Sequence, residues 1–71
     1  MEKKYWLINI AGKHGYSFVV CGELEDADVA IDAALKAELF NYEEDAYYAT
    51  AEEADENDIK QFTEWKCCHE V

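Results

Sequence analysis

The chain is 71 residues long, with 51% hydrophobic and 14% aromatic residues. Units with a core of their own are typically about 50 residues or longer, so we expect residues 1–71 to form a single domain. The aromatic content excludes a disordered acidic tail, because such tails lack the side chains that build a core. Seventeen acidic residues against six lysines give a net charge of −11. A surface this negative repels nucleic acid and anionic membranes, which excludes direct binding to either.

The charge is unevenly distributed along the chain. Residues 1–22 carry Lys3, Lys4 and Lys13 against Glu2, whereas residues 23–71 carry the other 16 acids and three lysines, a net charge of −13. A negative field confined to the latter part of the chain steers association toward basic partners.

A β-hairpin is predicted at the start of the chain. Residues 4–10 alternate, with Trp6, Ile8 and Ile10 on one side, and the sequence Ala-Gly-Lys-His-Gly then provides a turn. The second strand runs from Tyr16 to about Leu24, is rich in aromatic and β-branched residues, and has Gly22 as a candidate bulge.

A helix and a third strand follow the hairpin. Apolar residues recur at intervals of three and four from Ala27 to Phe40, after acidic N-cap candidates at Asp26 and Asp28. The segment from Asp45 to about Ala51 is typical of a strand, which a helical crossover places beside the first strand.

The last third of the chain leaves one alternative open. Thr50 and Glu53 match a capping box, while the acids from Glu52 to Asp58 equally fit a solvated loop, and a helix from about 55 to 67 follows in either case. The predicted fold is therefore α+β, a small ββαβα domain. Its three-stranded antiparallel sheet has the order 2-1-3 and is packed by one or two helices.

Both faces of the predicted hairpin are apolar. A single helix covers only one of them, so the C-terminal helix, a second copy of the chain or a partner must cover the other. A homodimer through the uncovered sheet face is thus one expectation.

The sequence offers little that would support catalysis or metal binding. His14 lies in the predicted turn, and Cys67, Cys68 and His69 lack the spacing of zinc ligands and lie close to the end of the chain, where we expect fraying. No Walker, Rossmann or nucleophile-elbow pattern is present. We therefore expect a protein that is not an enzyme and that has no catalytic residues, metal or cofactor.

The cellular compartment is predicted from the cysteines and the apolar segments. Three cysteines, two of them adjacent, do not form a disulfide framework, which favours a reducing cytosol. The N-terminal apolar run is short and is interrupted by Asn9, so it fits neither a signal peptide nor a membrane span. We expect a cytoplasmic protein.

The strongest candidate for function is the acidic segment from Glu43 to Asp58, which contains no lysine. As one helix it would space its charges at roughly 3 Å, close to the 3.4 Å of a single nucleic acid strand. Tyrosines are interleaved with these acids, and Tyr47 and Tyr48 should point to opposite faces of a strand, which leaves one of them exposed. The predicted partner-binding residues are Glu43, Glu44, Asp45, Tyr48, Glu52, Glu53, Asp55, Glu56 and Asp58.

These observations favour an acidic protein-interaction module that occupies a basic, nucleic-acid-binding surface of a partner protein. Small acidic proteins of this kind suit inhibitors carried by phages or mobile elements. The alternative is a self-associating structural domain whose acids serve solubility only.

Overall fold

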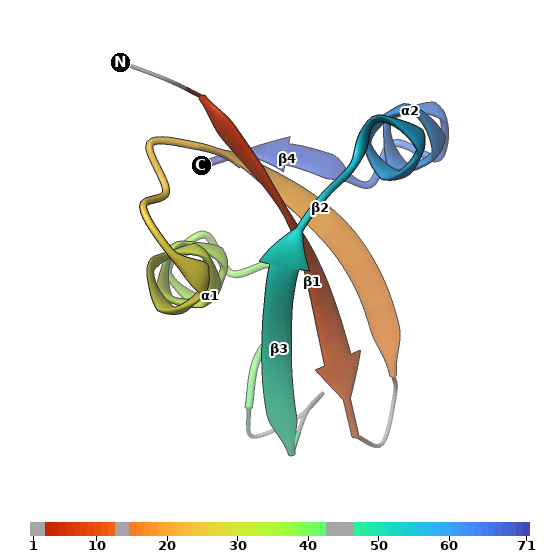
Figure 1. The fold of residues 1–71 in the computed structure, drawn as a ribbon. Coiled ribbons are helices and arrows are strands. Elements are labelled where there is room, and N and C mark those ends of the chain that lie inside the picture. Colours follow the sequence, from red (N-terminus) through yellow and green to blue (C-terminus); the bar gives the residue numbers. More distant parts are fainter. Residues whose placement is uncertain (1–2, 13–14, 43–46) are drawn as a thin grey trace.

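The computed structural model describes residues 3–12, 15–42 and 47–71 (Figure 1). The elements along these residues are, in order, β1 (Lys4–Ala11), β2 (Tyr16–Gly22), α1 (Ala27–Lys36), β3 (Tyr48–Glu53), α2 (Glu56–Glu64) and β4 (Cys68–Glu70). The predicted α+β class is confirmed. The turn at His14 and the predicted binding residues Glu43, Glu44 and Asp45 lie outside the described residues.

The strands form one mixed sheet in the order β3-β1-β2-β4. β1 pairs antiparallel with both β2 and β3, so the predicted order of these three strands is confirmed. The prediction of a three-stranded, wholly antiparallel sheet is wrong, because β4 adds a fourth strand parallel to β2. β4 has only three residues, and Cys68 pairs with Val19, far away in the sequence, so no local pattern indicates it.

Helix α1 ends at Lys36 and not at the predicted Phe40. Glu38 takes a positive φ of 59°, and the amides of Glu38 and Leu39 donate to carbonyls of the last helical turn. This closure is a Schellman motif, which satisfies the final carbonyls and turns the chain out of the helix.

Helix α2 begins later than the predicted capping box, because Thr50 and Glu53 belong to β3. The N-cap is Asp55, whose carboxylate accepts a hydrogen bond from the amide of Asp58 at 2.8 Å. The carboxylate of Asp58 in turn accepts from the amide of Asp55 at 3.4 Å. A capping box is thus present, but two aspartates form it, and the acidic segment is part strand and part helix.

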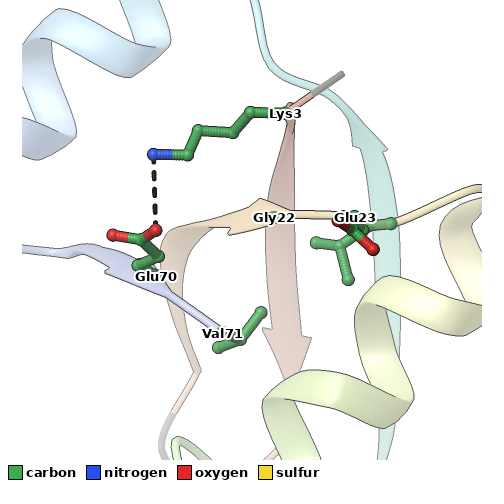
Figure 2. Close-up of a pocket in the computed structure, with 6 residues that line it drawn as sticks. Lys3, Gly22, Glu23, Glu70 and Val71 are labelled. Atoms are coloured by element: carbon green, nitrogen blue, oxygen red, sulfur yellow. Dashed lines mark ion pairs between the residues drawn. The ribbon is translucent and has the colours of Figure 1, made fainter. Parts of the chain in front are cut away.

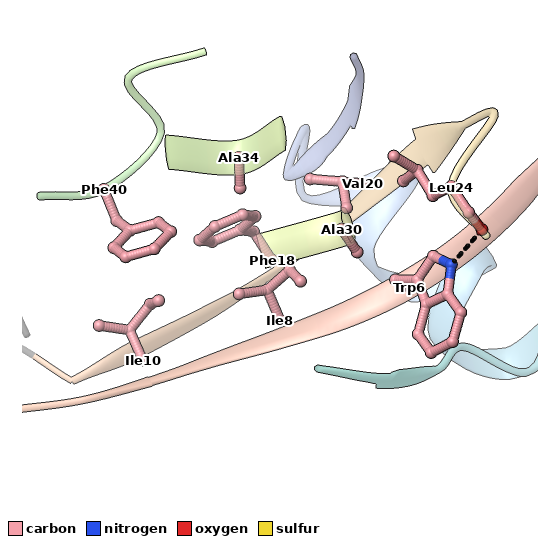
Figure 3. Close-up of a cluster of buried hydrophobic side chains, with 9 residues drawn as sticks. All are labelled: Trp6, Ile8, Ile10, Phe18, Val20, Leu24, Ala30, Ala34 and Phe40. Atoms are coloured by element: carbon pink, nitrogen blue, oxygen red, sulfur yellow. Dashed lines mark hydrogen bonds between the residues drawn. The ribbon is translucent and has the colours of Figure 1, made fainter. Parts of the chain in front are cut away.

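The main core lies between α1 and the sheet face that carries Trp6, Ile8 and Ile10 (Figure 3). Register places Val20 and Phe18 of β2 beside Trp6 and Ile8 on this face. Trp6 is buried, and its Nε1 donates to the carbonyl oxygen of Leu24 at 3.1 Å, which leaves the indole nitrogen satisfied. Helix α1 contributes Ala30 and Ala34, whose small side chains allow it to pack closely on the strands.

The opposite sheet face is covered at one end by the chain itself. Val19 and Cys21 point to this face by strand alternation, yet they are only 0% and 5% exposed. They lie on β2, which β4 pairs and which α2 packs against, on the side of the sheet away from α1 (Figure 1). Farther along this face Ser17 donates to Asn9 at 2.7 Å, so the part of the face beyond Val19 is polar.

Candidate interaction surface

Strands β2, β3 and β4 run in the same direction, so the segments that follow them all begin at the same end of the sheet. β2, β3 and β4 are all antiparallel to β1 or parallel to β2, so their carboxyl ends meet at one end of the sheet. Register confirms this, since Lys4 lies opposite Gly22 and Trp6 opposite Glu53. In Figure 1 this is the upper end, toward which the arrow of β3 points.

Acidic side chains follow these strand ends, and we refer to the group as the acidic end. The segment after β2 leads to α1 on one face of the sheet, and the segment after β3 leads to α2 on the other. The acidic end comprises Glu23, Glu25, Asp26, Asp28, Glu52, Glu53, Asp55, Glu56, Asp58 and Glu70. Lys3 and Lys4, at the start of β1, lie at the same end.

Few of these charges are neutralised within the described residues. Lys3 pairs with Glu70 at 3.4 Å, and the Glu70 carboxylate raises the pKa of Lys3. The second ion pair in the described part of the chain joins Lys36 and Asp32 within α1, at 3.1 Å.

The predicted binding residues that the structure describes fall into two groups. Glu52, Glu53 and Glu56 are exposed and, among the described residues, make no side-chain hydrogen bond or ion pair. Asp55 and Asp58 form the capping box of α2, where negative charge also interacts favourably with the helix dipole. Part of the acidic character is therefore structural, and the three glutamates are the groups most available to a partner.

Tyr48 is not beside these acids. It begins β3 whereas Glu52 lies near the end of the strand, four residues on, which corresponds to about 13 Å. Tyr47 precedes the strand, and both tyrosines are exposed, at 83% for Tyr47 and 59% for Tyr48. Both tyrosines of the pair are therefore exposed, where only one was expected, and Tyr48 lies at the opposite end of β3 from Glu52 and Glu53.

Sequence reasoning did not assign Glu23, Glu25, Asp26, Asp28 or Glu70 to the binding surface. They lie near the end of β3 because β2, β3 and β4 run in the same direction. The sequence indicated the directions of β2 and β3, but it did not indicate β4, which carries Glu70. Asp26 also has a structural role, since its carboxylate accepts from the amide of Val29 at 2.9 Å and caps α1.

The residues Cys67, Cys68 and His69 do not converge on a common point. His69 packs edge-on against Phe18 at 6.0 Å between ring centroids, on the face covered by α1, whereas Cys68 pairs in register with Val19 of the opposite face. Cys68 and His69 belong to a paired strand, so the expected terminal fraying is wrong for them. Among the described residues no three histidine, cysteine or acidic side chains are grouped to hold a metal ion.

Cys21 is a buried free thiol on the sheet face opposite α1. Burial raises its pKa, and the neighbouring Cys68 thiol adds to the shift. A raised pKa keeps the thiol protonated and unreactive near neutral pH, which is the opposite of what a nucleophile requires.

A hollow at the acidic end is lined by both charged and apolar residues (Figure 2). Its walls are formed by Lys3, Gly22, Glu23, Leu24, Glu70 and Val71. The Lys3–Glu70 ion pair spans one side of it, and the ionisable groups on its walls are those of the acidic end and Lys3.

Within the described residues, neither helix has the length and apolar character needed to cross a membrane. Comparison of the chain with protein-family models, with curated proteins and with solved structures gave no match.

Proposed function

We propose that the protein is a non-enzymatic interaction module whose acidic end binds a basic surface on a partner protein. The observation that carries the proposal is the strand topology, which brings acids from three separate segments to one end of the sheet. Glu52, Glu53 and Glu56 are exposed there and have no internal cationic partner among the described residues.

The charge exceeds what solubility requires. A net charge of about 2 to 8 in magnitude is typically enough to keep a small domain soluble, whereas this chain carries −11. Gathering like charges costs self-repulsion, and a basic partner removes that cost when it binds. The acidic end is therefore suited to hold positive charge.

The chemistry of the partner follows from the carboxylates. Exposed glutamates accept charge-assisted hydrogen bonds from lysine and arginine, the side chains that nucleic-acid-binding surfaces use to contact phosphates. A nucleic-acid-handling protein of the cytosol is the partner that fits best, and occupation of its binding surface would inhibit it, as phage- or mobile-element-encoded inhibitors do.

The test is affinity capture of basic, nucleic-acid-binding proteins with the wild-type chain and a triple variant, Glu52→Lys, Glu53→Lys and Glu56→Lys. These positions avoid the capping aspartates, so the variant retains the capping box of α2. We expect the wild type to capture a partner at low salt, to release it at high salt, and to lose it to a competing oligonucleotide.

The matched control reverses three exposed acids outside the acidic end, Asp32→Lys, Glu38→Lys and Glu64→Lys. This control changes the net charge by the same amount and should retain the partner. Equal capture by both triple variants would refute the proposal, since it would show that position on the surface does not matter.

A further inference from the structure

Strand β3 forms an edge of the sheet and pairs only with β1 among the described strands. No other described strand lies along its outer edge, and helix α1 packs against β3 on one face of the sheet. None of its residues is buried: Ala49 and Ala51 are half-buried, and the others are exposed. An edge strand of this kind presents backbone amides and carbonyls that another strand can pair with.

The hydrogen-bond pattern identifies which backbone groups are free to pair. The amide of Ala54 donates to the carbonyl of Tyr5 of β1 at 3.0 Å. Backbone groups of alternate residues face the same neighbouring strand, so those of Tyr48, Thr50 and Glu52 also face β1. The backbone groups of Ala49, Ala51 and Glu53 therefore point outward, away from the sheet.

The pattern on the other side of β1 agrees with this assignment. If the backbone groups of Tyr5 and Leu7 face β3, those of Trp6 and Ile8 face β2. Trp6 and Ile8 pair with Val20 and Phe18, so the backbone groups of the alternate residues, Val19 and Cys21, face β4. The amide of Val19 does donate to the carbonyl of Cys67, at 2.9 Å, and the amide of Val71 donates to the carbonyl of Cys21, also at 2.9 Å.

The side chains along the edge select the charge of an added strand. Glu52 and Glu53 are neighbours on β3 and point to opposite faces, so a strand laid along the edge meets a carboxylate on each face. Opposite charges directly across a strand pair stabilise it, and like charges destabilise it. A second copy of this chain would bring another net charge of −11 to the edge, so the charge disfavours self-pairing.

We propose that β3 accepts an extended, lysine- or arginine-bearing segment of the partner as an additional strand. The outward groups of Ala49, Ala51 and Glu53 would hold its backbone, and Glu52 and Glu53 would select its positive charge. This inference rests on the proposed function and adds the mode of recognition, strand addition at a sheet edge.

The experiment uses the whole chain and a defined probe, a capped peptide of about eight residues in which lysine alternates with threonine, a length typical of a strand. Amide hydrogen exchange is measured with and without the peptide. We expect exchange at Ala49, Ala51 and Glu53 to slow by about tenfold or more, because their amides become hydrogen-bonded, while the amides of Thr50 and Glu52, which already face β1, change less.

A pair of proline variants tests the edge from the protein side. Ala51→Pro removes an outward amide without removing a bond to β1, and should weaken peptide binding about tenfold. Ala27→Pro is the control, because the first position of α1 needs no amide donor and tolerates proline, so binding should be unchanged.

The outcomes separate this inference from the function on which it rests. Peptide binding that is lost on reversing Glu52, Glu53 and Glu56, but that neither protects Ala49 and Ala51 nor responds to Ala51→Pro, would overturn strand addition and leave the basic partner in place. Protection of the edge amides that grows with protein concentration and without peptide would assign the edge to a second copy and overturn the inference. Failure of the peptide to bind would also overturn it.

Discussion

Gly22, at the end of β2, is a position where the chain that follows β4 closely approaches the sheet at the acidic end. Its φ of 152° is one that side-chain-bearing residues rarely adopt. A Cβ placed there would lie 2.6 Å from the carbonyl oxygen of Val71, whose amide bonds to Cys21. The predicted bulge at Gly22 is wrong, since the residue pairs in register with Lys4, and the reason for glycine is the close approach of the chain that follows β4.

Gly22→Ala should destabilise the protein by about 1–3 kcal/mol, because it adds backbone strain and displaces Val71. Urea unfolding followed by circular dichroism measures this. Gly15→Ala is the control, because the added Cβ would lie 3.3 Å from the carbonyl oxygen of Ile10, a tight contact but well beyond the 2.6 Å found at Gly22. If both variants lose the same stability, the close approach of Val71 is not what requires glycine at position 22.

The thiol of Cys21 links stability to pH. Its pKa is raised in the folded state above its ordinary value of 9.0, because burial disfavours the thiolate. Below pH 9 the thiol is protonated in both the folded and the unfolded chain, and its contribution to stability is fully present. Above pH 9 the unfolded chain releases the proton first, so this contribution is lost as the pH rises toward the folded-state pKa.

The measurement is the midpoint of thermal unfolding between pH 7 and pH 10 for the wild type and for Cys21→Ala. We expect the midpoint of the wild type to fall more steeply than that of the variant above pH 9. Parallel curves would show that Cys21 does not titrate differently on folding.

At the scale of elements, the parts that follow local rules were predictable. The alternation around Trp6 and Ile8 identified β1, and the apolar periodicity after Asp26 identified α1. β4 was missed because three residues show no periodicity and pair with a strand distant in the sequence. The end of α1 was misplaced because Glu38 occupies a left-handed position that glycine usually marks.

Helix α2 separates the structural acids from those free to bind. Asp55→Ala removes the cap and should lower stability by about 1 kcal/mol, whereas Glu56→Ala, on a side chain without a hydrogen bond among the described residues, should change it by less than about half that. Chemical denaturation of both variants measures the difference.

Asp55→Asn is the informative companion, because asparagine also caps helices but carries no charge. It should retain most of the stability of the wild type and lose only the favourable interaction of the charge with the helix dipole. If Asp55→Ala is as stable as Glu56→Ala, the capping box makes no net contribution.

At the scale of the whole molecule, the location of the charge could be predicted only in part. The sequence indicated an acidic segment around Glu52 and Glu56, but it did not show that Tyr48 lies at the opposite end of β3, about 13 Å from Glu52. The acids from Glu23 to Asp28 joined the surface through the parallel directions of β2 and β3. Among the described residues, the directions of the strands, rather than the local density of charge along the chain, gather these acids at one end of the sheet.

We expect the two acidic segments, residues 23–28 and 52–58, to act together on a positive ligand. The direct measurement is a nuclear magnetic resonance titration of the whole chain with a lysine-rich peptide. We expect the amide signals of both segments to shift along one saturating curve, while those of Asp32, Glu38 and Glu64 stay in place. Shifts spread evenly over all exposed acids, or confined to one segment, would contradict it.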